Sequence, residues 1–165
     1  MDETIEEDKK MKLTDHFSLK EFTDSAKAQK LGIENKPTLE HIKNLKRLSE
    51  ELEIIREGLN KIITITSGYR CPALNKAVGG EKTSKHLEGN AADINVSISL
   101  REVMNYCIKN KDKINYDKII YETGKEGENW IHFQQLNDES KHRKLAIRGK
   151  YNHQKETMEY SPYIG

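Results

Sequence analysis

Two histidines and one aspartate in this sequence have the side chains and the setting of a metal site. His86 and Asp93 lie seven positions apart with a glycine and two alanines between them, and His132 interrupts a later apolar run. Two imidazoles and a carboxylate can hold zinc at three positions and leave a fourth for water. A zinc ion held in this way activates its water and polarises a carbonyl group, which is the chemistry of hydrolysis. The pattern therefore predicts a zinc hydrolase centred on His86, Asp93 and His132.

Each of these signals is weak when it is taken separately. A single histidine in a strand is more often an ordinary core or surface residue than a ligand. Asp93 lies between Ala92 and Ile94, where a charge is costly unless something compensates it, although it could also cap a turn. The metal interpretation is favoured because it accounts for all three residues together, along with the motifs described below.

The elements that would position these residues alternate between helices and strands. Helices are predicted from periodicity and from capping residues, which are Thr38, Ser99 and a capping box of Ser18 and Glu21. Strands are predicted from β-branched and alternating patterns. Residues 25–37 are predicted to form a linker. Helices are expected at 16–22, 38–59, 72–78 and 97–110, and strands at 61–68, 91–96, 116–122, 129–134 and, as an edge strand, 145–147. This order predicts a single α+β domain with a mainly antiparallel sheet and helices on one side.

The length and charge of the chain limit the classes of protein it can belong to. At 165 residues the chain is long enough for one domain with a core and hardly for two. We expect a flexible arm at 1–14, the zinc hydrolase domain at 15–150 and a tail at 151–165. A net charge of +1 gives no general attraction to nucleic acid, and no apolar run of about eighteen residues predicts a membrane span. By default the chain is expected to be a monomer.

The cellular compartment is predicted from the N-terminus and the two cysteines. The first residues are acidic and have no apolar stretch, so we do not expect them to form a Sec-type signal peptide. Cys71 and Cys107 are expected to be reduced thiols, because nothing in their spacing requires a disulfide. The protein is therefore expected to be made in the cytoplasm and to reach any other compartment by different means.

The motifs around the three candidate ligands resemble a known family. The pattern Ser84-x-His86-x-x-Gly89-x-Ala91-x-Asp93, followed by Trp130-x-His132, resembles zinc D-alanyl-D-alanine carboxypeptidases and L-alanyl-D-glutamate endopeptidases. These cell-wall metallopeptidases share their fold with D-Ala-D-Ala dipeptidases and the hedgehog signalling domain. The segments 67–75 and 17–22 also resemble the family, the latter its phage-type branch, so the likeness runs from about Phe17 to Phe133.

The resemblance implies roles for individual residues. His86, Asp93 and His132 match the zinc ligands. Arg70 matches an arginine that holds the substrate carbonyl or the developing oxyanion, and Ser84 matches a serine that contacts substrate or supports the ligands. A structural ion pair is the alternative for Arg70, and shaping of the loop is the alternative for Ser84.

The general base is the point at which this chain departs from several relatives. They place an acidic residue or a histidine three positions before the last ligand, where this sequence has Asn129, whose amide cannot act as a base. The phage-type branch instead places a glutamate at the end of the first hairpin strand, which Glu122 matches. Glu128 is the second candidate, and either residue could be an ordinary loop carboxylate.

The resemblance implies an enzyme that hydrolyses a peptide bond involving D-amino acids in bacterial peptidoglycan. The partner would be the peptidoglycan peptide, and both carboxypeptidase and endopeptidase activity remain open. A phage lysin that acts on the cell wall, released by lysis or carried by the particle, fits the expected lack of an export signal. The alternative is an inactive zinc-containing module of the same fold that binds the wall or a protein, because a shared fold does not guarantee shared chemistry.

Overall fold

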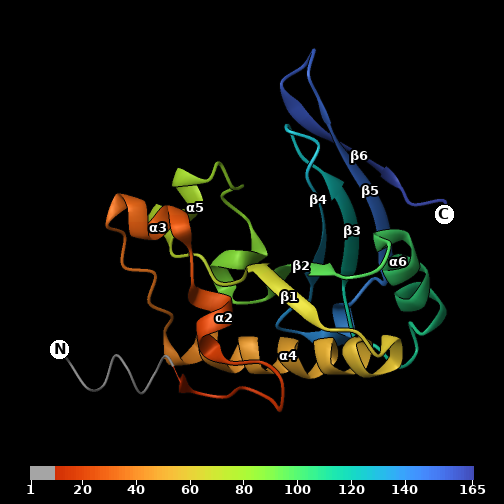
Figure 1. Ribbon diagram of the computed structural model, residues 1–165, viewed down its shortest axis with the longest axis horizontal. Helices are drawn as coiled ribbons and strands as arrows, with labels where there is room; N and C mark the ends of the chain where they lie inside the picture. The colour runs from red at the N-terminus through yellow and green to blue at the C-terminus, as the bar shows by residue number, and fades with distance from the viewer. Residues whose placement is uncertain (1–9) are drawn as a thin grey trace.

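The computed structural model describes residues 10–165. A mixed sheet of six strands runs through the molecule in the order β1-β2-β4-β3-β5-β6 (Figure 1). The strands are β1 (Ile63–Ser67), β2 (Ala91–Val96), β3 (Lys118–Thr123), β4 (Asn129–Gln134), β5 (Leu145–Asn152) and β6 (Thr157–Pro162). Every neighbouring pair is antiparallel except β3 and β5, which are parallel. The predicted α+β class with a mainly antiparallel sheet is confirmed.

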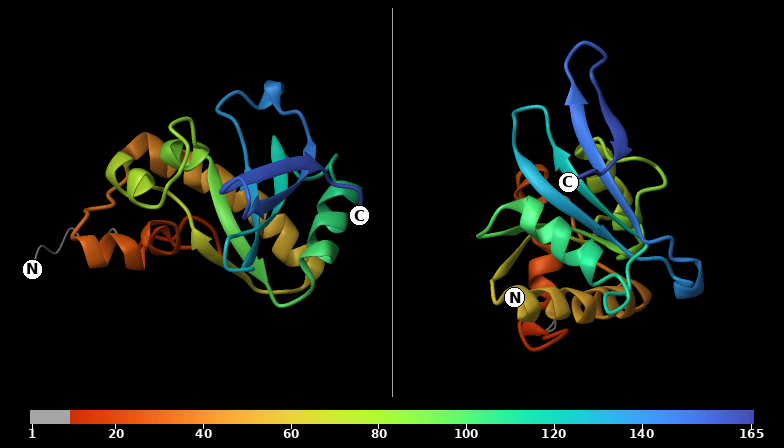
Figure 2. Two further views of the ribbon diagram at one scale, coloured as in Figure 1. Left: turned by 90° about the horizontal axis from the view of Figure 1, so that it is seen from above. Right: turned by 90° about the vertical axis from the view of Figure 1, so that its right-hand side faces the viewer.

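The long helix α4 (Leu39–Leu59) and the helix α6 (Leu100–Lys109) form the core with one face of the sheet (Figure 2). Both helices begin at capping residues predicted from the sequence, Thr38 and Ser99. Side chains alternate along a strand, so Ile131 and Phe133 of β4 point into this core while His132 points to the other face. The core thus fixes the strands whose opposite face carries the candidate site. The buried core residues of the two helices are Leu45, Leu48, Leu52, Ile55, Leu100, Val103, Met104 and Cys107.

Three short helices, α2 (Leu19–Thr23), α3 (Ala26–Leu31) and α5 (Pro72–Ala77), lie toward the β1 end of the sheet (Figure 1). The predicted capping box of Ser18 and Glu21 is present at the start of α2. The linker predicted at 25–37 is wrong in part, because residues 26–31 form α3. Ser25 caps this helix by accepting a hydrogen bond from the backbone N–H of Ala28. A helix of six residues is too short to show a convincing apolar period.

The two ends of the chain contribute more structure than their sequence pattern indicates. Residues 1–9, most of the expected arm, lie outside the described residues, while Leu13 is buried in the core. The predicted edge strand 145–147 is part of the longer strand β5, which lies inside the sheet, and β6 forms the edge in a region where no element was predicted. The side chains of β5 are mostly half-buried and those of β6 mostly exposed, so these strands are held largely by backbone pairing and show little periodicity in the sequence.

None of the helices within residues 10–165 is both long enough and apolar enough to cross a membrane.

Candidate metal centre

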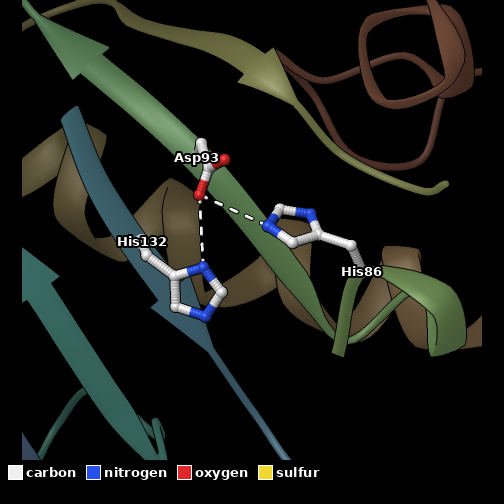
Figure 3. A group of neighbouring side chains, drawn as sticks. All are labelled: His86, Asp93 and His132. Atoms are coloured by element: carbon white, nitrogen blue, oxygen red, sulfur yellow. Dashed lines mark hydrogen bonds and ion pairs between the residues drawn. The ribbon is translucent and has the colours of Figure 1, made fainter. Parts of the chain in front are cut away.

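His86, Asp93 and His132 converge on one point of the sheet face that is turned away from α4 and α6 (Figure 3). His86 comes from a single turn of 3-10 helix, Lys85–Glu88, just before β2. Asp93 lies in the middle of β2, directly opposite His132 on β4. One ligand atom from each residue lies within 4.8 Å of the others. The structure therefore brings together the three residues that the sequence singled out.

The hydrogen bonds of the two imidazoles determine which nitrogen atoms face the centre. Asp93 Oδ1 is 3.3 Å from His86 Nε2 and 3.2 Å from His132 Nδ1. The other nitrogen of His86, Nδ1, lies 2.7 Å from the carbonyl oxygen of Gly68, which can only accept, so Nδ1 carries the proton. Neutral His86 thus presents the lone pair of Nε2 to the centre, as a metal ligand requires.

His132 is oriented in the same way by a chain of side chains. Its Nε2 is 3.0 Å from Gln134 Oε1, and Gln134 Nε2 donates to Asp117 Oδ2 at 3.0 Å. A carboxylate only accepts, so this second bond fixes the orientation of the amide. Arg143 donates two hydrogen bonds from its guanidinium to Asp117, which is fully buried. The chain from Arg143 to His132 thus directs Nδ1 of His132 toward the centre, where it contacts Asp93 and could bind an ion.

Gly68 connects the imidazole of His86 to the packing of the N-terminal helix α2. A Cβ atom at position 68 would lie 2.5 Å from the backbone oxygen of Phe22. Only glycine allows the two backbone segments to approach this closely. The carbonyl that orients His86 is therefore held in place by helix packing.

The charges at the centre favour an ionised carboxylate between two imidazoles. Burial alone would raise the pKa of Asp93, but His86 and His132 hold it far below its usual range. Burial lowers the pKa of His86 and favours its neutral form. Burial would also lower the pKa of His132, but its hydrogen bond to Asp93 and the charge of that carboxylate raise it. Two imidazoles and one buried carboxylate are a donor set that suits zinc.

Arg70 reaches the centre from the loop after β1. One terminal nitrogen, Nη2, lies 3.5 Å from Asp93 Oδ2, while Nε donates to Ser67 Oγ and Nη1 donates to Asn75 Oδ1, both at 3.1 Å. The side chain is 14% exposed, so part of the guanidinium faces the open side of the site. Ser84 Oγ accepts the backbone N–H of His86, which shapes the turn that carries this ligand.

Glu122 lies on the same face of the sheet as His132, one row of residues further along. Ile120 of β3 is directly opposite His132, and Glu122 is directly opposite Trp130. Because Glu122 is two positions after Ile120 in the same strand, its side chain is on the face that carries His132. Glu122 is only 9% exposed, and burial raises the pKa of its carboxyl group while the positive charge of His132 opposes that rise. It is not one of the three converging residues.

Glu128 and Asn129 occupy different surroundings. Glu128 is exposed in the β3–β4 turn, and its carboxylate accepts the backbone N–H of Glu126. Asn129 lies three positions before His132 in the same strand, so alternation turns it to the opposite face. There its Oδ1 accepts a hydrogen bond from Thr123. The side chain of Asn129 is thus engaged with Thr123, and its amide cannot act as a base.

Comparison with known proteins agrees with the geometry. The sequence matches the family Peptidase M15 over residues 15–134, more than half of the chain, and the chain belongs to this family. Membership indicates a metallopeptidase that depends on zinc, and the cluster of His86, Asp93 and His132 could bind that ion. No curated protein matches the chain in a sequence search.

Sequence reasoning did not identify Asp117 and Arg143, which support His132 through Gln134. The shared face of Gln134 and His132 follows from the sequence, because the two residues are two positions apart in a strand. The contact from Gln134 to Asp117 crosses between strands, so only the register could have revealed it.

Proposed function

We propose that the protein is a zinc peptidase that hydrolyses a peptide bond involving a D-amino acid in bacterial peptidoglycan, as a carboxypeptidase or an endopeptidase. The observation that carries this proposal is the convergence of His86, Asp93 and His132 on one point. Glu122 lies on the same face of the sheet. The substrate class rests on the resemblance of the motifs at 84–93 and 130–132 to cell-wall metallopeptidases. Action on the cell wall, after lysis or from a phage particle, is part of the same proposal.

His86, Asp93 and His132 would hold the zinc ion through Nε2, a carboxylate oxygen and Nδ1. When bound, zinc lowers the pKa of water and polarises a carbonyl group. His86 and His132 bind in their neutral forms, and their outer nitrogens keep both rings oriented through Gly68 and Gln134. The carboxylate of Asp93 supplies the negative charge of the ligand set.

Glu122 acts as the general base and then as the general acid. Its carboxylate takes a proton from the attacking water and delivers it to the nitrogen of the leaving amine. Burial raises the pKa of Glu122 and brings it closer to neutrality, which suits a group that must both accept and donate a proton. The exposed Glu128, held in the turn, lacks this setting.

Arg70 stabilises the oxygen of the scissile carbonyl as negative charge develops on it. Its guanidinium is permanently charged and lies beside Asp93 at the edge of the centre. Hydrogen bonds to Ser67 and Asn75 fix its orientation before substrate arrives, so little reorganisation is needed during the reaction.

Incubation with peptidoglycan tests the proposal. The zinc-loaded protein is incubated with purified peptidoglycan, with and without a chelator, and newly formed amine ends are measured. We expect release that the chelator abolishes and that added zinc restores. A digest of defined muropeptides then identifies the bond, because a carboxypeptidase releases a terminal D-amino acid and an endopeptidase cuts within the peptide. Stoichiometric zinc without any release would instead support the binding module.

A further inference from the structure

The hairpin of β5 and β6 lies outside the residues that match the family and adjoins the strand that carries Glu122. It extends beside the β3–β4 hairpin and is drawn in dark blue in Figure 1. Glu122 is directly opposite Gly149 on β5, and Gly149 is directly opposite Tyr160 on β6. Residues opposite one another in a sheet share a face, so Tyr160 lies on the face that carries the candidate site.

Gly149 leaves a gap between Glu122 and Tyr160 that the tyrosine ring partly fills. A Cβ atom at position 149 would lie 2.9 Å from Cε1 of Tyr160 and 3.4 Å from Cγ of Glu122. The ring therefore leans across Gly149 toward the glutamate. Any side chain larger than hydrogen at position 149 would displace the ring.

The ring of Tyr160 is accessible from solvent and its hydroxyl group lies among carboxylates. The residue is 56% exposed. Burial of the hydroxyl, together with the negative charges of Glu122, Glu81 and Asp93, raises the pKa of Tyr160 to about 12. The phenol therefore stays protonated at the pH of any enzymatic reaction and can donate a hydrogen bond.

Glu81 is one of the carboxylates whose negative charge raises the pKa of Tyr160. It belongs to the loop between α5 and the turn that carries His86, on the β1 side of the molecule.

We propose that Tyr160 contacts the substrate on the amine side of the scissile bond and helps to select the residue that leaves. The inference rests on the proposed function, in which Glu122 delivers a proton to the leaving nitrogen. Because Tyr160 is next to Glu122 across Gly149, it is close to the portion of the substrate that follows this nitrogen. The ring offers an apolar surface for a small side chain, and the hydroxyl offers a donor to a carbonyl or carboxylate oxygen.

Kinetic comparison of three variants tests this assignment. Tyr160→Phe removes the hydroxyl, Tyr160→Ala removes the ring, and Tyr163→Phe is the matched control. Tyr163 lies three residues further along, and its hydroxyl contacts Asn105 of α6. We expect Tyr160→Phe to lower kcat/KM by roughly 2- to 10-fold, mainly through KM, as for loss of one hydrogen bond. Tyr160→Ala should lower it further and reduce the discrimination between muropeptides that differ in the leaving residue, whereas Tyr163→Phe should match the wild type.

Gly149→Ala provides a second and independent test. The added methyl group should push the ring of Tyr160 aside and raise KM in the otherwise wild-type protein. In the Tyr160→Ala background the ring is absent, so the same change should have almost no further effect. Binding is also measured without turnover, by combining each change with Glu122→Gln so that the muropeptide is not cleaved. The dissociation constants of these zinc-loaded variants are then compared with that of Glu122→Gln alone.

Two results would count against the inference in distinguishable ways. If the wild type cleaves muropeptides and the Tyr160 variants keep its KM, its discrimination and its dissociation constants, Tyr160 does not contact the substrate and the proposed function stands. If the wild type binds zinc and cleaves no muropeptide, the proposed function fails and this inference fails with it. The melting temperature of each variant shows whether it is folded. If Tyr160→Ala does not fold, the comparison of Tyr160→Phe with the wild type decides the question, because this variant keeps the ring.

Discussion

Asp93 and His132 are directly opposite each other on β2 and β4, with Oδ1 of one 3.2 Å from Nδ1 of the other. Two of the three candidate ligands are thus placed by the register of a single strand pair. A slip of one residue would turn either side chain into the helix-packed core, where it would meet Ile131 or Ile94. The buried face of the sheet therefore secures the geometry of the site on the opposite face.

The first prediction concerns zinc binding. We expect one zinc ion per chain and a melting temperature that rises by roughly 5–10 °C when free zinc is about a hundred times its dissociation constant. Asp93→Ala should remove both effects, because it deletes the carboxylate that lies between the two imidazoles. His153→Ala is the control, since this exposed histidine lies in the β5–β6 turn. Full zinc content in Asp93→Ala, measured by metal analysis, would contradict the ligand assignment.

The second prediction concerns the general base. Glu122→Gln should keep zinc and lower kcat by roughly 10²- to 10⁴-fold, because the amide cannot accept a proton. Glu128→Gln makes the same chemical change in an exposed turn residue and should leave turnover nearly unchanged. Near-normal turnover by Glu122→Gln with intact zinc binding would remove Glu122 from this role.

The third prediction concerns the dependence of activity on pH. Burial raises the pKa of Glu122 above the ordinary value of 4.5. The base is active when deprotonated, so kcat/KM should fall on acidification at a higher pH than for an exposed glutamate. Protons also compete with zinc for His132, whose pKa is raised in the absence of the ion. Zinc content is therefore measured at each pH, and a fall centred at the ordinary glutamate value with zinc retained would argue against the buried base.

The fourth prediction concerns the support of His132. Gln134→Leu removes the acceptor for the Nε2 proton and should weaken zinc binding by roughly 10- to 100-fold. The matched control is Gln29→Leu, at an exposed position on α3. Competition with a chelator of known affinity measures the effect. An unchanged zinc affinity would mean that Asp93 and the packing of the strand orient His132 without Gln134.

The fifth prediction concerns Arg70. Arg70→Lys keeps a positive charge but loses the fork of donors, so kcat should fall by roughly 10²- to 10³-fold, as for loss of an oxyanion donor. Arg101→Lys makes the same change at an exposed position on α6. Zinc affinity is measured in parallel, since Arg70 also contacts Asp93. A fall in zinc affinity without any change in kcat at saturating zinc would indicate a structural ion pair.

The sequence was sufficient to predict the elements and residues whose signals are local. Thr38 and the apolar period of α4, together with the strand patterns of β2 and β4, predicted these elements with bounds close to those observed. Asp93 and His132 could be predicted because their residue types are unusual in apolar strands, and His86 because it precedes the Asp93 strand in the same motif. The arrangement of Glu122 could be expected only through the resemblance, since its position depends on which strands pair.

Other features depend on contacts between distant parts of the chain and could not be predicted. α3 is too short to show periodicity, and the strand β6 has mainly exposed side chains. The link from Asp117 to His132 and the approach of Tyr160 to Glu122 both require the order of strands in the sheet. A single sequence contains no direct record of that order.

The parallel pairing of β5 with β3 has a consequence for how the chain folds during synthesis. Until residues 145–152 have been made, one side of β3 has no strand next to it. The strand that carries Glu122 is then an open edge whose backbone donors and acceptors can pair with another chain. A polypeptide that stops after the family-matched residues would keep this edge exposed, and we expect it to self-associate even though it contains all three zinc-binding side chains.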